Sequence, residues 1–189
     1  LTFPLIRGIS SPYYEYADRD VYAAFEQLFL NSGMPHDFHA HDGYLYKTFF
    51  AFWINIHDYL SVDIVSNMNQ FFKQVSLKGF GSTITPIIIS GRVFTVMLAV
   101  LFIAFFVYGL YLFCNNWGFA ILGGLLLSTT GSFMLSTVVM KPGLLSALFL
   151  MLAVFAVLLY TKERNASDPI YLFLLGLFSM LSVMGRNIS

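Results

Sequence analysis

A run of 22 uncharged residues from Val93 to Cys114 constrains the fold more than any other feature of the chain. As an α-helix, VFTVMLAVLFIAFFVYGLYLFC would be about 33 Å long, enough to cross the hydrocarbon core of a bilayer. The composition agrees, because 58% of the 189 residues are hydrophobic, against roughly 45–50% in soluble domains. The sequence therefore predicts an integral membrane protein.

Three further apolar segments follow this run. Asn115-Asn116 separates it from an uncharged run over 117–140, which ends at Lys141-Pro142. Two more apolar segments, at 143–161 and 169–186, flank the polar sequence TKERNASD. With the first span at about 87–114, residues 86–189 are predicted to form four transmembrane helices joined by short links.

Residues 1–85 follow a different pattern, with apolar residues recurring every three or four positions in three segments. The stripes are Val21, Ala24, Phe25, Leu28 and Phe29; Leu45, Phe49, Phe52, Trp53, Ile56 and Leu60; and Ile64, Met68, Phe71, Phe72 and Val75. Such helices lie at a membrane interface or pack on the end of a bundle. The predicted fold is all-α: a polytopic membrane helix bundle with an amino-terminal cap of interfacial amphipathic helices over 1–85.

Acidic residues are concentrated in this cap. Residues 1–85 hold eight acids and five bases, whereas 86–189 hold two acids and five bases. No basic block is long enough to follow the phosphates of a nucleic acid, so no nucleic-acid partner is predicted. Cys114, the single cysteine, excludes an internal disulfide. Since the chain starts at Leu1 and stops just after an apolar run, we interpret it as one domain, incomplete at both ends.

Two carboxylates stand at the start of the first cap helix. Asp20 suits the N-cap position, where its side chain would accept backbone amide hydrogens. Asp18 has four tyrosines nearby in the sequence: Tyr13, Tyr14, Tyr16 and Tyr22. Partial desolvation there would raise the pKa of a carboxylate toward that of a general base. The alternative for Asp18 is a solvated loop acid paired with Arg19.

Three histidines, His36, His39 and His41, lie in a loop that also contains Asp37 and Asp42. These are ligand types for a zinc or manganese ion. Their spacing matches no closed-site signature, and a hydrogen-bonded, solvated loop is the alternative. A divalent metal is therefore a candidate cofactor, and the sequence indicates no other.

Three cations are predicted on the cap side of the membrane. Arg92 precedes the first span, Lys141 lies between the second and third, and Arg186 ends the fourth. They could be end charges that reach the interface, or they could hold a phosphate in the headgroup layer. Lys162 and Arg164, on the opposite side, favour the cytoplasm for that side. The cap would then face the periplasm or the exterior.

The order of motifs resembles a known family. An acid with an aromatic four residues later in DRDVY is followed by NSGMPHDFHAHDGYLY, an Arg-headed span and MKPGLLSALFLMLAVF. This order is similar to the amino-terminal part of membrane-embedded glycosyltransferases that use lipid-phosphosugar donors, of the GT-C fold. That class includes protein O-mannosyltransferases and the aminoarabinose and rhizobial lipopolysaccharide sugar transferases. The resemblance covers essentially the whole chain.

The resemblance implies that a sugar is transferred from a polyprenyl-phosphate donor to a hydroxyl acceptor on the non-cytoplasmic face of the inner or plasma membrane. The family's catalytic acid falls on Asp18, with Tyr22 at the expected spacing. Its second acid falls on Arg19, a departure that leaves Asp20 as the other candidate base. The family's cation near the lipid phosphate falls on Lys141 or Arg186.

Two other classes of function stay open. A transporter or channel would normally carry polar or ionisable groups near the middle of its spans, and three of the four predicted spans hold almost none. A noncatalytic membrane-assembly protein could use the cap as a docking surface. Both remain alternatives to the enzyme.

Overall fold

The computed structural model describes residues 17–32, 44–59, 63–71, 77–140, 142–162 and 169–184. Over these ranges all regular structure is α-helical, which confirms the predicted all-α fold. The helices are α2 (Ala17–Ser32), α3 (Tyr44–Tyr59), α4 (Ile64–Phe71), α5 (Leu77–Cys114), α6 (Trp117–Ser128), α7 (Gly131–Val138), α8 (Gly143–Lys162) and α9 (Pro169–Met184).

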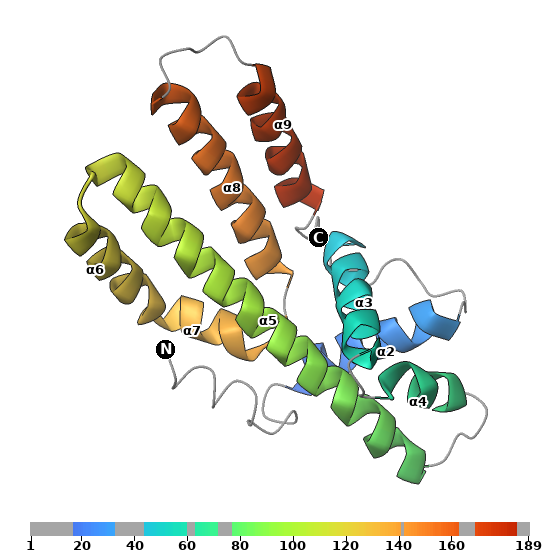
Figure 1. Cartoon of the computed structure of the whole chain (residues 1–189). Helices are drawn as coiled ribbons and strands as arrows, with labels where there is room; N and C mark the ends of the chain where they lie inside the picture. Colours follow the sequence, from blue (N-terminus) through green and yellow to red (C-terminus); the bar gives the residue numbers. More distant parts are fainter. Residues whose placement is uncertain are drawn as a thin grey trace.

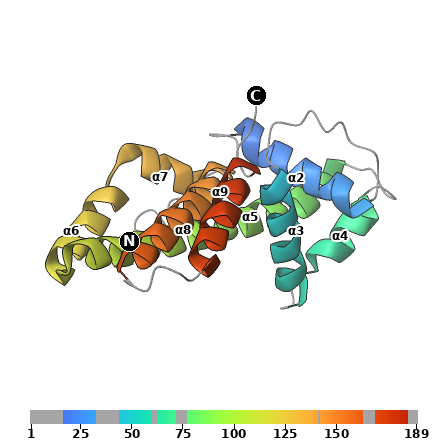
Figure 2. The same cartoon turned by 90° about the horizontal axis from the view of Figure 1, so that it is seen from above.

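Helix α5 is the axis of the molecule. Its 38 residues span about 57 Å at a rise of 1.5 Å per residue, nearly twice the hydrocarbon thickness of a bilayer. Helices α6, α8 and α9 lie toward its carboxyl end, whereas α2, α3 and α4 gather toward its amino end (Figures 1 and 2). One helix therefore serves both as a membrane span and as the support for the cap.

Two of the described helices are long and apolar enough to cross a membrane by themselves, over 81–114 and 143–161. Much of the outward-facing surface of these helices is apolar: Val100, Leu101, Tyr108, Phe113, Leu150, Val154 and Val157 are exposed. Contact between these side chains and lipid tails has no hydrophobic cost, whereas their exposure to water is unfavourable. The membrane character predicted from the sequence is confirmed for these two helices.

The segment predicted as one span over 117–140 consists instead of two helices, α6 and α7, bent by 69° at the break between them. The hydroxyls of Ser128, Thr129 and Thr130 each donate to the carbonyl three residues earlier, at 2.8–2.9 Å. Side chains of this kind compete with the backbone for helical hydrogen bonds and favour a helix end. The pair can act as a broken span, which raises the number of crossings to three.

The turn between α5 and α6 follows the predicted polar step. Asn115 adopts a positive φ of 53°, which Asn tolerates better than most residues. Asn116 caps α6 by accepting hydrogen bonds from the amides of Gly118 and Phe119, at 2.8 and 3.4 Å. Helix α6 can then run back along α5.

The glycines of α6 allow it to approach α5 closely. A Cβ at Gly123 would collide with the Leu110 side chain, and one at Gly124 would collide with Val107. A larger residue at either position would require these side chains to shift, and small residues favour close packing of membrane helices. These two glycines therefore serve the packing of α6 on α5.

Helix α9 lies beside α8, and the Ser182 hydroxyl donates to the Ser146 carbonyl at 2.9 Å. With 16 residues, α9 is about 24 Å long. It covers 169–184 of the span predicted over 169–186, and residues 185 and 186 lie outside the described part of the chain.

The three described cap helices pack on the amino-terminal half of α5, as predicted. Their buried side chains form one cluster with that half of α5, which includes Leu28, Phe50, Met68, Ile84 and Ile88. The predicted boundary between cap and spans at residues 85 and 86 falls inside α5. The apolar residues of 84–88 face protein rather than lipid, and composition alone does not distinguish these two environments.

Candidate functional site

The buried face of α2 carries a carboxylate. Asp20, Ala23, Ala24, Gln27 and Leu28 are buried and recur at the three-to-four spacing of one helical face. Asp20 is 0% exposed. A charged group in such a place needs partners, because removing a charge from water without compensation is costly.

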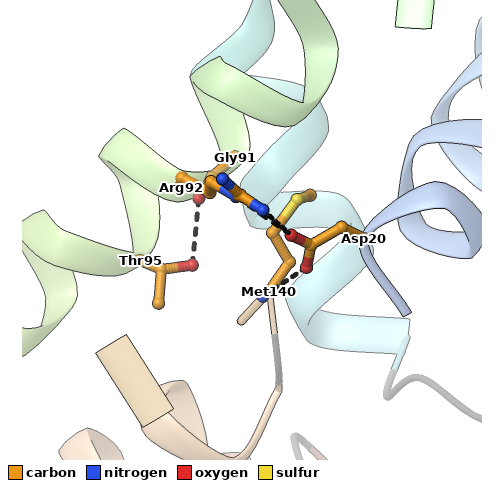
Figure 3. Close-up of polar contacts among 5 residues, drawn as sticks. All are labelled: Asp20, Gly91, Arg92, Thr95 and Met140. Atoms are coloured by element: carbon orange, nitrogen blue, oxygen red, sulfur yellow. Dashed lines mark hydrogen bonds and ion pairs between the residues drawn. The ribbon is translucent and has the colours of Figure 1, made fainter. Parts of the chain in front are cut away.

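Both oxygens of Asp20 are engaged (Figure 3). Oδ2 accepts a hydrogen bond from Arg92 Nε at 3.0 Å and lies 3.0 Å from Arg92 Nη2. Oδ1 accepts a hydrogen bond from the backbone amide of Met140 at 2.9 Å. A single carboxylate thus connects α2, α5 and the segment between α7 and α8. We call these three residues the Asp20 joint.

The predicted N-cap role of Asp20 is wrong. Helix α2 begins at Ala17, so Asp20 lies inside the helix rather than before it. Its side chain bonds residues 72 and 120 positions away instead of the amides of its own helix. Helix propensity could not reveal this, since an acid near a helix start suits both roles.

Gly91 allows the backbone of α5 to come close to Met140 and Phe50. A Cβ at Gly91 would lie 2.6 Å from Met140 Sδ and 2.8 Å from Phe50 Cζ. Its carbonyl accepts a hydrogen bond from the Thr95 hydroxyl at 2.9 Å (Figure 3). A larger residue before Arg92 would require the Met140 and Phe50 side chains to shift.

We expect Gly91→Ala to lower the melting temperature of the detergent-solubilised protein. The added methyl group overlaps Met140 and Phe50, and overpacking of this kind costs about 1–3 kcal/mol. Gly81→Ala, in the same helix with nothing within 4 Å of its Cβ, is the matched control and should not destabilise. Equal losses of melting temperature in the two variants would contradict the close contact at Gly91.

Arg92 was one of three predicted phosphate-binding cations. It is 2% exposed and its guanidinium contacts Asp20, so in this arrangement it is not presented to a lipid headgroup. The geometry gives Arg92 a structural role. The same holds for Asp20, because a general base must reach the hydroxyl whose proton it takes.

A second buried ion pair supports the cap, and the sequence did not indicate it. Lys47 Nζ of α3 lies 2.8 Å from Glu26 Oε1 of α2. Gln27 Nε2 donates to the Lys47 carbonyl at 3.2 Å, and Trp53 Nε1 donates to the Ser90 carbonyl at 3.1 Å. The available signal was a polar residue on an otherwise apolar helix face, as at Glu26, but that pattern does not identify the partner.

Several predicted site residues lie outside the described part of the chain. They are Lys141, Arg186, His36, His39 and His41. Asp18 lies in the first turn of α2, but its side chain is outside the described set. Within that set no group of three or more His, Cys, Asp or Glu side chains could hold a metal ion. The metal prediction for the histidine loop stays a prediction.

No protein-family model, no curated protein and no solved structure matches the chain. Its fold class and membrane character therefore rest on the sequence and on the helices themselves.

Proposed function

We propose that the protein is a multi-pass membrane glycosyltransferase. It transfers a sugar from a polyprenyl-phosphate carrier to a hydroxyl of a lipid, glycan or protein on the non-cytoplasmic face. The order of motifs from DRDVY to MKPGLLSALFLMLAVF supports this reaction class. Apolar helices long enough to cross a bilayer suit a donor with a polyprenyl tail.

The hydrogen bond between Asp20 and the Met140 amide is the structural observation that most supports the proposal. It joins two positions that are 120 residues apart. Asp18 precedes Asp20 by two residues, and Lys141 follows Met140 directly. The bond therefore ties the segment with the candidate acid to the segment with the candidate phosphate-binding cation.

The proposed reaction has separate roles for the acid and the cations. The Asp18 carboxylate takes the proton of the acceptor hydroxyl while the hydroxyl oxygen attacks the anomeric carbon. The bond from that carbon to the phosphate oxygen breaks, and the polyprenyl phosphate leaves as an anion. Lys141 and Arg186 stabilise the charge that develops on the phosphate. Asp20 and Arg92 hold the helices.

The cap is proposed to face the periplasm or exterior. Lys162 ends α8, away from the Asp20 joint, and Arg164 follows two residues later in the sequence. Both would be cytoplasmic by the excess of basic residues in cytoplasmic loops. Donor headgroup and acceptor would then meet at the outer boundary of the membrane.

We expect Lys141→Ala and Arg186→Ala each to weaken binding of the lipid-linked donor by about ten- to a hundredfold, the loss of one charge-assisted contact. Lys162→Ala removes the same kind of charge on the opposite side and should leave donor affinity unchanged. The measurement is the dissociation constant of a fluorescent polyprenyl-phosphate sugar in detergent or nanodiscs. Equal effects of all three substitutions would count against the phosphate assignment.

One observation favours a second candidate, a transporter. Discontinuous helices often line substrate paths in transporters, and α6 and α7 are bent by 69°. A transporter would move a labelled solute across a sealed proteoliposome and would leave the donor's sugar–phosphate bond intact. Cleavage of that bond favours the transferase.

A further inference from the structure

We propose that Asp20 is a positioning residue whose carboxylate holds the segment at Met140 against α2. By doing so it sets the separation between the start of α2 and the start of α8. The consequence for donor binding rests on the proposed function, since Asp18 and Lys141 flank the two ends of this bond in sequence.

The buried backbone amide of Met140 needs a hydrogen-bond acceptor from elsewhere in the chain. It lies between α7 and α8, after Val139, whose backbone is extended at φ −113° and ψ 137°. Met140 is 1% exposed, and a buried backbone N–H requires an acceptor. Asp20 Oδ1 supplies that acceptor at 2.9 Å (Figure 3).

Arg92 prevents the carboxylate from turning away. It contacts Oδ2 through Nε and Nη2, both at 3.0 Å, while Oδ1 faces Met140. Arg92 belongs to α5, the axis of the molecule. The orientation of the carboxylate is thus fixed by the longest helix, and the Met140 segment follows that orientation.

The alternative is that the ion pair only joins α2 to α5 and the bond to Met140 is incidental. Two double variants separate these cases. In the D20N/R92Q variant, the side-chain oxygen of Asn can still accept a hydrogen bond from the backbone amide of Met140. The side-chain nitrogen of Asn can donate to the side-chain oxygen of Gln. Asp20→Leu with Arg92→Leu removes the acceptor and both charges of this ion pair, a replacement that is often neutral for stability.

The readout is the distance between α2 and α8 in the intact protein, by pulsed electron paramagnetic resonance. Spin labels are attached to cysteines at Tyr22, which is 69% exposed, and at Gly143, where a Cβ has nothing within 4 Å. Cys114, which is exposed, is first changed to Ser. We expect a narrow distance distribution in the wild type and in the D20N/R92Q variant, and a broadened one in the D20L/R92L variant. A narrow distribution in the D20L/R92L variant would overturn the proposal.

A second comparison does not depend on whether the leucine pair folds. Met140→Pro removes the amide donor and leaves Asp20 and Arg92 untouched, and the extended backbone of Val139 is compatible with a following proline. Met140→Leu changes the same side chain and keeps the donor. We expect Met140→Pro to broaden the distance distribution and Met140→Leu to leave it narrow. Identical distributions in these two variants would also overturn the proposal.

Donor kinetics connect this constraint to the proposed reaction. Loss of the hydrogen bond to Met140 in the D20L/R92L variant should raise KM for the lipid donor about tenfold, the effect of one hydrogen bond. The D20N/R92Q variant should retain the wild-type KM. If no variant and no wild-type protein transfers sugar, the proposed function fails, and the distance measurements still decide the role of Asp20.

Discussion

Replacing Asp18 with Asn is expected to abolish sugar transfer while donor binding and folding stay nearly intact. An acceptor hydroxyl is a poor nucleophile, and a positioned carboxylate that takes its proton contributes about 10²–10⁴-fold to the rate. An amide cannot accept this proton. The measurement is transfer of a labelled sugar from its polyprenyl-phosphate carrier in membranes, normalised to the amount of folded protein.

Asp20→Asn is the matched control for this prediction. Asn at position 20 can still accept a hydrogen bond from the Met140 amide, but it leaves Arg92 without its buried counter-ion. We therefore expect a loss of stability and a smaller change in turnover per folded molecule. The reverse pattern, with full turnover in Asp18→Asn and none in Asp20→Asn, would move the base to Asp20. Full activity in both variants would show that neither acid is the base.

The largest expected loss of stability comes from breaking the ion pair at Arg92. Arg92→Ala leaves the fully buried Asp20 carboxylate without a compensating charge, which costs about 3–5 kcal/mol in buried pairs of this kind. Thermal unfolding in detergent measures the loss of stability caused by Arg92→Ala. Asp63→Asn, at an exposed carboxylate of the cap, is the control and should change the free energy of unfolding by less than about 0.5 kcal/mol.

The double variant with leucine at positions 20 and 92 completes this series. It removes both charges together, so we expect it to be more stable than Arg92→Ala. If Arg92→Ala instead unfolds at the wild-type temperature, the pair is not buried as described. If the double variant is less stable than Arg92→Ala, an uncompensated buried charge is not the cause of the loss.

Helix content and helix positions were readable from the sequence, because apolar periodicity and apolar runs depend on local residues. The stripe around Leu28 and the run from Val93 to Cys114 both correspond to helices. The start of α5 was not readable, because apolar residues near Ile84 face the cap rather than lipid. Nor was the break after Ser128 readable, since small polar residues also serve helix packing.

The candidate site was less predictable than the fold. Sequence reasoning selected Asp20 and Arg92 as functional residues, but it could not pair them across 72 positions or recognise the backbone amide of Met140 as a partner. The sequence is the same whether the carboxylate and the guanidinium are buried together or separately solvated. Their pairing depends on how α2 packs against α5, which only the three-dimensional arrangement reveals.

We propose that this membrane protein uses a lipid-phosphate-linked sugar as its donor. The most direct measurement is to incubate the purified intact protein in proteoliposomes with polyprenyl-phosphate-linked sugars and, separately, with nucleotide-linked sugars, and to follow release of the carrier. We predict release of free polyprenyl phosphate that depends on Asp18, and no turnover of nucleotide sugars. Turnover of nucleotide sugars alone, or solute uptake without cleavage of any donor, would contradict the proposed reaction.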